Sequence, residues 1–169
     1  MIPLLPYKRL VFESHLSRGV IIRRLRVEVA NRRLGGAIFE RRTEKFEGEV
    51  SETGFKISRI IRYRNSFLPI VQGQFSPLVK GVRIEVRMRL HVAVLIFSVL
   101  WLGFVGVGAV TGISQIVSTG KFEGGMLIPL GMLLFYYLLV TIGFGVEANK
   151  AGKLLRDIFE ADDCGNQKA

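Results

Sequence analysis

The stretch RIEVRMRLHVAVLIF, residues 83–97, changes from strict alternation of polar and apolar residues to a continuous apolar run. In its first half, charged and aliphatic side chains alternate with a period of two, which is typical of a strand that buries one face. From His91 onward, the next charged residue is Lys121. The pattern therefore predicts a half-exposed strand that leads, without a linker, into a membrane-spanning helix.

Two segments of the chain are apolar enough to cross a membrane. Neither residues 91–120 nor residues 124–146 contain a charged side chain. A helix needs roughly 20 apolar residues to cross about 30 Å of hydrocarbon, because it rises about 1.5 Å per residue. Only a short turn separates the two segments. We therefore expect a transmembrane helical hairpin at residues 91–147, with spans at about 91–113 and 125–146.

The first 90 residues contain both helical and strand patterns. Leu16, Ile21 and Leu25 recur at helical spacing, which predicts a helix between about residues 14 and 31. One run before this helix and four runs after residue 43 resemble strands that are separated by turn residues. The economical architecture for residues 1–90 is an α+β domain in which one helix covers a sheet of four or five antiparallel strands.

The apolar periodicity continues after the second span. Ala151, Leu154 and Ile158 share one helical face, and charged residues occupy the others. We expect a short C-terminal amphipathic helix and an acidic tail at residues 148–169. The helix has two candidate positions, at the membrane interface or folded back onto the sheet.

The distribution of charge predicts the orientation. The chain contains 24 Lys plus Arg and 14 Asp plus Glu, a formal net charge of +10. Most of the basic residues precede the first span and others follow the second, so the positive-inside rule places both termini in the cytoplasm. MIPLLPYKRL lacks the residue order of an export signal, and the single Cys164 agrees with a reducing compartment. We expect a chain that is integral to a bacterial-type inner membrane or plasma membrane.

Two groups of residues are candidates for binding a partner. The cluster RYRNS at 62–66 could bind a phosphate or carboxylate, because arginine forks pair with such anions and turn amides add donors; a hairpin turn explains the same residues. The arginines of the strand at 83–89 could dock on lipid headgroups or simply anchor the topology. The candidate residues for a protein partner or a headgroup are Arg62, Tyr63, Arg64, Asn65, Arg83, Arg87 and Arg89.

Aromatic and small residues recur within the predicted spans. In a hairpin, the single tryptophan and two tyrosines lie at similar depth near the middle of the bilayer, although these residue types usually occupy the interfaces. Either hydrogen bonds within the hairpin or a quinone, pigment or neighbouring subunit would explain them. Glycines four residues apart allow helices to pack closely. The predicted intramembrane packing residues are Trp101, Gly103, Gly106, Gly108, Gly112, Tyr136 and Tyr137.

The sequence contains no motif of a metalloprotease, nucleophile elbow, phosphate loop or dinucleotide site. We therefore expect no catalytic residue, metal site or resident cofactor, and no nucleic-acid partner. The leading hypothesis is a non-catalytic accessory or assembly subunit of a larger membrane complex, with a basic sheet held at the cytoplasmic membrane surface. The alternative is a module that binds anionic lipid or senses a signal. A lipid-acting enzyme would require Glu49, His91 or Tyr63 as its catalyst.

Overall fold

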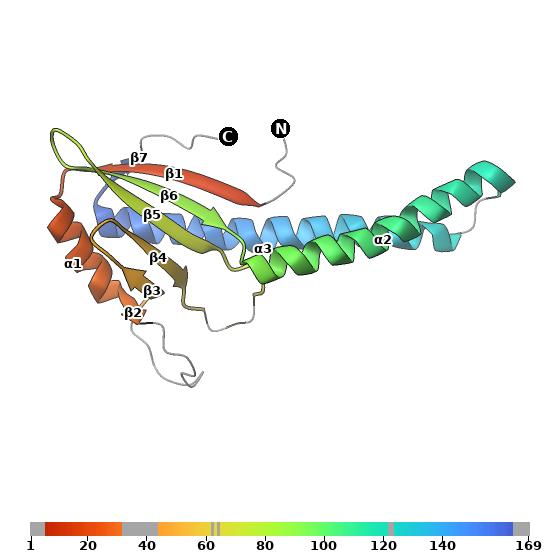
Figure 1. Cartoon of the computed structure of the whole chain (residues 1–169), viewed down its shortest axis with the longest axis horizontal. Helices are drawn as coiled ribbons and strands as arrows, with labels where there is room; N and C mark the ends of the chain where they lie inside the picture. The colour runs from red at the N-terminus through yellow and green to blue at the C-terminus, as the bar shows by residue number, and fades with distance from the viewer. Residues whose placement is uncertain (1–5, 32–43, 62, 64, 122–123, 164–169) are drawn as a thin grey trace.

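The computed structural model describes residues 6–31, 44–61, 63, 65–121 and 124–163. Within these residues, the chain forms an α+β fold with a sheet at one end and two long helices that project from it (Figure 1). The elements in chain order are β1 (Tyr7–Ser14), α1 (Arg18–Glu28), β2 (Val29–Asn31), β3 (Phe46–Val50), β4 (Gly54–Arg59), β5 (Ile70–Pro77), β6 (Val82–Arg89), α2 (Val92–Thr119), the short 3-10 helix η1 (Gly124–Met126), α3 (Leu127–Phe159) and β7 (Asp162–Asp163).

The strands form one sheet in the order β2-β3-β4-β5-β6-β1-β7. Neighbouring strands are antiparallel except for β2 and β3, which are parallel. The α+β class agrees with the prediction, but the described sheet is mixed and has seven strands instead of four or five. The strands β2 and β7 are only three and two residues long. Segments this short have no alternating pattern that would identify them in the sequence.

β6 has one buried face and one polar face, as its alternation predicts. Ile84, Val86 and Met88 are fully buried on the face of the sheet that forms the core. The charged residues between them lie on the opposite face. β6 ends at Arg89 and α2 begins at Val92. The strand therefore leads directly into the apolar helix.

α3 is one uninterrupted helix of 33 residues. The prediction of a separate, short C-terminal amphipathic helix was therefore wrong, because that segment forms the last turns of α3. The sequence VEANKAGK at residues 146–153 contains no proline and a single glycine, so nothing ends the helix where its apolar run ends.

The second half of α3 covers the inner face of the sheet (Figure 1). Ala148, Ala151 and Leu155 are fully buried there. Near the end of the helix, the Phe159 ring packs edge-on against Phe12 of β1, with 5.7 Å between the ring centroids. α1 closes the same core through its own apolar face. Of the two positions left open for this segment, the structure therefore has the one folded onto the sheet.

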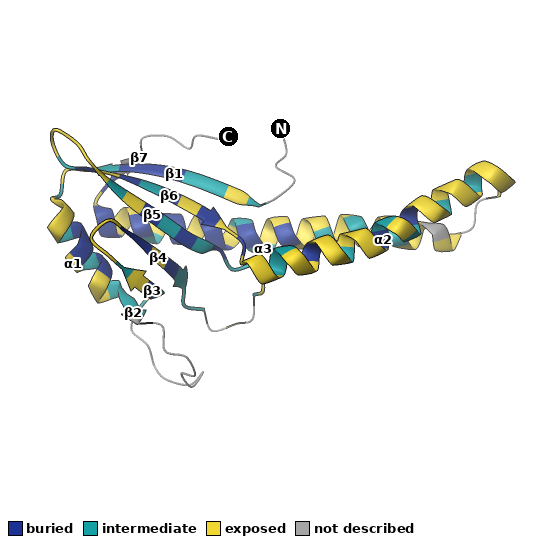
Figure 2. Cartoon of the chain, in the orientation of Figure 1, coloured by how far each residue is buried: buried dark blue, intermediate teal, exposed yellow. Residues whose placement is uncertain are grey.

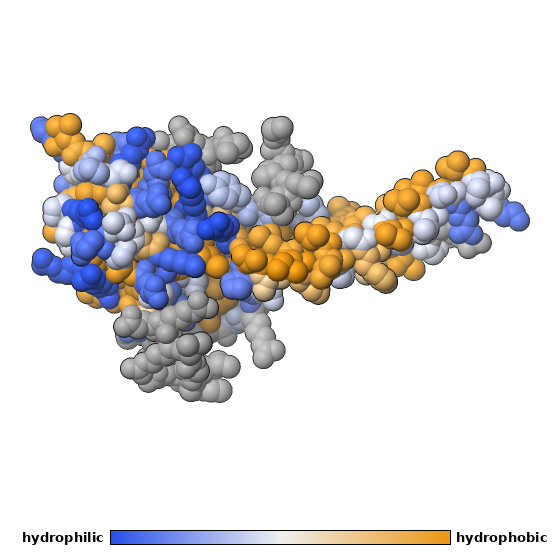
Figure 3. Space-filling view, viewed as in Figure 1, coloured by the Kyte–Doolittle hydropathy of each residue, from blue (hydrophilic) through white to orange (hydrophobic). Residues whose placement is uncertain are grey.

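α2 and the first half of α3 form an antiparallel hairpin that extends beyond the sheet (Figure 1). Both helices are long and apolar enough to cross a membrane. Most of their large apolar side chains are exposed, whereas those of the sheet domain are buried (Figure 2). The exposed apolar surface runs along the hairpin and meets the polar surface of the sheet domain where the hairpin begins (Figure 3).

Candidate functional site at the junction of sheet and helices

The loop between β4 and β5 lies beside α3, where this helix passes from the hairpin to the sheet (Figure 1). The predicted binding cluster at residues 62–66 belongs to this loop. Tyr63 and Asn65 both contact α3, whereas Arg62 and Arg64 lie outside the described residues. We call the contacts of this loop and of Arg59 with α3 the junction.

Glu147 of α3 is the centre of the junction. It is 1% exposed, yet its carboxylate has three donors. The Arg59 guanidinium donates to Oε2, and the Tyr63 hydroxyl donates to Oε1. Lys150 Nζ donates to Oε1 over 3.4 Å and also lies 5.9 Å from the centroid of the Tyr63 ring. Because a buried carboxylate is costly unless it is paired and hydrogen-bonded, these partners explain how α3 can bury it.

The same partners keep the carboxylate ionised. Burial raises the pKa of Glu147 and is the largest single influence on it. The hydrogen bond from Tyr63 and the positive charges of Arg59 and Lys150 act in the opposite direction, and together they hold the pKa below its usual value of 4.5. Glu147 is the first charged residue after the apolar run 124–146. The junction thus contains an ionic cluster at the boundary between the apolar and polar parts of α3.

Asn65 attaches the loop to α3 on the hairpin side of Glu147. Its Nδ2 donates to the carbonyl oxygen of Gly143 over 3.2 Å, and its Oδ1 accepts from the backbone N–H of Phe67 over 2.9 Å. Gly143 permits this approach, since a Cβ there would lie 3.3 Å from Cδ2 of Phe67. Asn65 therefore both shapes the turn and holds it against the helix.

Phe67 connects the loop with the aromatic residues of the hairpin. Its ring packs edge-on against Tyr136, with 6.4 Å between centroids, and Tyr136 stacks on Trp101 at 4.7 Å. The Tyr136 hydroxyl donates to Oγ of Ser98, whose own hydroxyl donates to the carbonyl oxygen of Val94 over 2.6 Å. The polar end of Tyr136 is therefore satisfied by hydrogen bonds within the hairpin.

The other predicted packing residues of the spans lie outside this aromatic cluster. Tyr137 is 41% exposed, and Gly112 is partly buried. A Cβ at Gly103 or Gly106 would have no atom of another element within 4 Å, whereas one at Gly108 would lie 3.7 Å from a proline of α3. The described chain thus covers one of these three glycines and leaves the other two facing outward.

The arginines of β6 lie apart from the junction, on the outer face of the sheet. Arg83 and Arg87 lie 3.7 and 3.8 Å from glutamate oxygens, and their side chains remain about half exposed. Arg89 donates to the side-chain oxygen of Gln72 on β5. Of the predicted binding residues that the structure describes, Tyr63 and Asn65 therefore contact α3, whereas the arginines of β6 lie on the outer face of the sheet.

Five residues of the junction were not among the predicted site residues: Arg59, Phe67, Gly143, Glu147 and Lys150. The sequence does contain a signal for Glu147, which follows Phe144 by three residues and precedes Ala151 by four. This spacing puts the carboxylate on the apolar stripe of α3. Arg59 and Phe67 lack such a signal, because their roles depend on where the loop packs.

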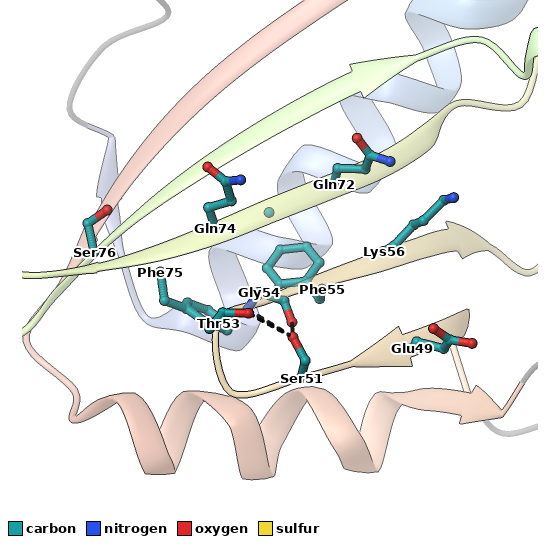
Figure 4. Close-up of a pocket in the computed structure, with 11 residues that line it drawn as sticks. Glu49, Ser51, Thr53, Gly54, Phe55, Lys56, Gln72, Gln74, Phe75 and Ser76 are labelled. Atoms are coloured by element: carbon teal, nitrogen blue, oxygen red, sulfur yellow. Dashed lines mark hydrogen bonds between the residues drawn. The ribbon is translucent and has the colours of Figure 1, made fainter.

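A polar depression of about 470 Å³ lies over β3, β4 and β5 (Figure 4). Gly54 lines the depression and has no side chain to fill it. The side-chain amides of Gln72 and Gln74 also line the depression. Its lining includes both Glu49 and Lys56. The depression therefore has one acidic and one basic side chain in its lining.

Comparison of the chain with protein-family models, curated proteins and solved structures finds no match. Within the described ranges, no three side chains of His, Cys, Asp or Glu are grouped so that they could hold a metal ion.

Proposed function

We propose that this chain is a non-catalytic accessory or assembly subunit of a larger membrane protein complex. Its two apolar helices cross a bacterial-type inner membrane or plasma membrane, both termini are cytoplasmic, and the sheet is held at the membrane surface. The observation that carries this proposal is the continuity of α3, which belongs to the apolar hairpin and to the core of the sheet domain at once.

Continuity matters because it fixes the sheet relative to the hairpin. β6 runs into α2 after two residues, and α3 returns directly into the core of the sheet domain. The junction adds the buried cluster around Glu147 and the bond from Asn65 to Gly143. A domain on a flexible linker samples many orientations, whereas this sheet keeps one height and one tilt. A fixed platform suits a subunit that presents a surface to a neighbouring protein.

The orientation of the platform follows from charge. The turn between the apolar helices contains one lysine and one glutamate, whereas most basic residues belong to the sheet domain. Lys and Arg accumulate on the cytoplasmic side of membrane proteins, which supports a cytoplasmic sheet domain.

A structural role fits the polar groups of the junction. The buried carboxylate of Glu147 already accepts bonds from three donors, and the loop residues Tyr63 and Asn65 both bond to α3. Fully satisfied buried networks rigidify a structure. The half-exposed Arg83 and Arg87 offer contacts to an acidic protein surface, and the outward-facing glycines of α2 offer a close approach to a neighbouring span.

Photo-crosslinking in native membranes tests the accessory role. A photoreactive amino acid at Arg87, on the outer face of the sheet, is expected to give a discrete adduct with one membrane protein. The matched control places the same amino acid at Lys80, in the exposed β5–β6 turn at the far end of the sheet (Figure 1), where no such adduct is expected. Adducts with lipid alone at Arg87 would contradict an accessory subunit.

The alternative function, binding of anionic lipid headgroups or sensing at the membrane surface, is favoured by one observation. Lys150 and Arg89 lie at the end of the sheet domain that meets the hairpin, and the Lys150 side chain is about half exposed. Each such cation near an anionic leaflet contributes about 1 kcal/mol of attraction. Extraction in a mild detergent followed by mass spectrometry separates the two functions, since co-purifying subunits support the first and enriched anionic lipid alone supports the second.

A further inference from the structure

The tip of the β4–β5 loop, residues 65–69, reaches past the polar boundary of α3. Glu147 marks that boundary, and Gly143 and Tyr136 lie four and eleven residues further toward the hairpin. At the rise of an α-helix these positions are about 6 and 16 Å beyond Glu147. Asn65 bonds to Gly143, and Phe67 contacts both Gly143 and Tyr136. The loop tip therefore lies beside the apolar part of the helix.

The helix surface at this level is apolar and exposed. On α3, Leu139, Ile142 and Val146 expose much of their side chains, and on α2 Ile96 and Phe97 do the same. Exposed apolar side chains of this density belong in hydrocarbon, because large apolar patches in water are costly. The medium that surrounds these side chains is also the medium that the loop tip meets.

The loop tip is built for such a medium. The backbone N–H of Phe67 donates to Oδ1 of Asn65, and that of Leu68 donates to the carbonyl oxygen of Asn65 over 3.3 Å. Pro69 has no N–H to satisfy. Non-helical backbone is tolerated at membrane depth only where its polar groups are bonded within the protein. Asn65 accepts both of these bonds; within the segment Phe67 and Leu68 are partly exposed, Ser66 is exposed and Pro69 is buried.

We infer that residues 65–69 form a wedge that inserts into the cytoplasmic leaflet and packs against phospholipid acyl chains beside the hairpin. The inference rests on the proposed membrane function and adds a third membrane-contacting element to the two spans. The wedge enlarges the cross-section of the protein in one leaflet only. It also explains why a loop of the sheet domain bonds to a helix below the polar boundary.

Spin-label accessibility in phosphatidylcholine–phosphatidylglycerol vesicles tests the wedge. The full-length chain with Cys164→Ser, which removes the only cysteine, receives one new cysteine at a time. Ser66→Cys reports on the exposed loop tip, Ile142→Cys on the outer surface of α3, and Ser76→Cys on the far part of β5. Collisions with oxygen, which concentrates in lipid, are compared with collisions with a water-soluble nickel chelate. We expect position 66 to resemble position 142, with a high ratio of oxygen to nickel accessibility.

The controls distinguish failure of the wedge from failure of the membrane proposal. A lipid-like signal at position 142 and a water-like signal at position 66 would overturn the wedge alone. A water-like signal at both positions would overturn the membrane function as well. Shielding of position 66 from both reagents would also overturn the wedge, because it would mean that protein covers the tip.

A matched glycine pair keeps the test independent of one label position. Gly143→Leu intrudes on Phe67 and Asn65, whereas a side chain at Gly145 meets no atom of another element within 4 Å. In the labelled Ser66→Cys chain, Gly143→Leu is expected to shift the label toward water and Gly145→Leu to leave it in lipid. If the label at position 66 has the same accessibility in the two variants, the contact of Asn65 and Phe67 with Gly143 does not hold the loop tip in the leaflet.

Discussion

One side of α3 is packed along the whole helix, but against different partners in its two halves: the sheet in the second half and α2 in the first. In the half that covers the sheet, Ala151 and Leu155 are fully buried and Lys153 is exposed. In the half within the hairpin, Tyr136 packs against α2 while Leu134 is 61% exposed. The stripe therefore shows where the helix packs, and the residues outside the stripe are polar in one half and apolar in the other. Glu147, at the transition, is buried with its own counter-charges.

The largest effect is expected from removal of the Glu147 carboxylate, which lies between the two halves of α3. Glu147→Ala leaves Arg59, whose side chain is only 20% exposed, without its partner. Loss of one member of a buried pair typically costs about 3–5 kcal/mol. We expect a loss of this order in the free energy of unfolding, measured in detergent micelles.

The control for this prediction is Glu160→Ala, which removes the partner of Arg24 in an exposed ion pair. Exposed pairs contribute about 0–1 kcal/mol. If the two alanine variants lose the same stability, the cluster around Glu147 does not hold β4 and the β4–β5 loop against α3.

A smaller effect is expected from enlarging a glycine in each half of α3. A side chain at Gly152 meets Cδ1 of Leu10 at 3.0 Å, whereas one at Gly131 meets no atom of another element within 4 Å. Overpacking of a core costs about 1–3 kcal/mol. Thermal unfolding should therefore show Gly152→Leu as destabilised and Gly131→Leu as unchanged or slightly more stable, since leucine favours helix over glycine. The reverse order would contradict the assignment of the two surroundings.

Protonation of Glu147 at low pH is a milder change than removal of its carboxylate. The pKa of Glu147 is lower in the folded chain than its usual value of 4.5. Its stabilising contribution is therefore complete above about pH 4.5 and is lost as the pH falls through the lower, folded pKa. Comparison of unfolding midpoints across this window with those of Glu147→Gln should show a steeper acid loss in the parent chain. Parallel curves would contradict the role of this ionised carboxylate.

The smallest expected effect lies within the hairpin. Tyr136→Phe removes the hydroxyl that donates to Ser98 but keeps the ring stacked on Trp101. Side-chain hydrogen bonds between membrane helices contribute about 0.6 kcal/mol on average, so a loss of that order is expected in thermal unfolding. Tyr137→Phe, at an exposed position, is the control and should have no effect.

The parts of the fold that could be predicted from the sequence are those with a clear local pattern of apolar and polar residues. The alternation of β6 and the apolar lengths of α2 and α3 are such patterns, and they produced the α+β class and the helical pair. The continuity of α3 was missed because charge at residue 147 resembles the end of a span, although no helix-ending residue occurs there. The short strands β2 and β7 were missed because their pairing depends on tertiary contacts.

The candidate site was predictable only in part. The polar residues of the β4–β5 loop led to the prediction of Tyr63 and Asn65 as binding residues. In the structure both side chains bond to α3. These partners, Glu147 and Gly143, are 84 and 78 residues away in sequence. Such pairings follow from the way the helix returns across the sheet, which no local pattern encodes.

Measuring the depth of Trp101 in a bilayer is the most direct test of whether α2 and the hairpin half of α3 cross a membrane. Trp101 is the only tryptophan, and it stacks on Tyr136 of α3. The measurement is quenching of its fluorescence in vesicles by lipids brominated at different depths, with aqueous iodide as the opposing quencher. Trp101 lies nine residues beyond the start of α2, about 14 Å along the helix. Deep bromines should therefore quench it most strongly and iodide least. Quenching by iodide without quenching by brominated lipid would contradict the membrane location of the hairpin.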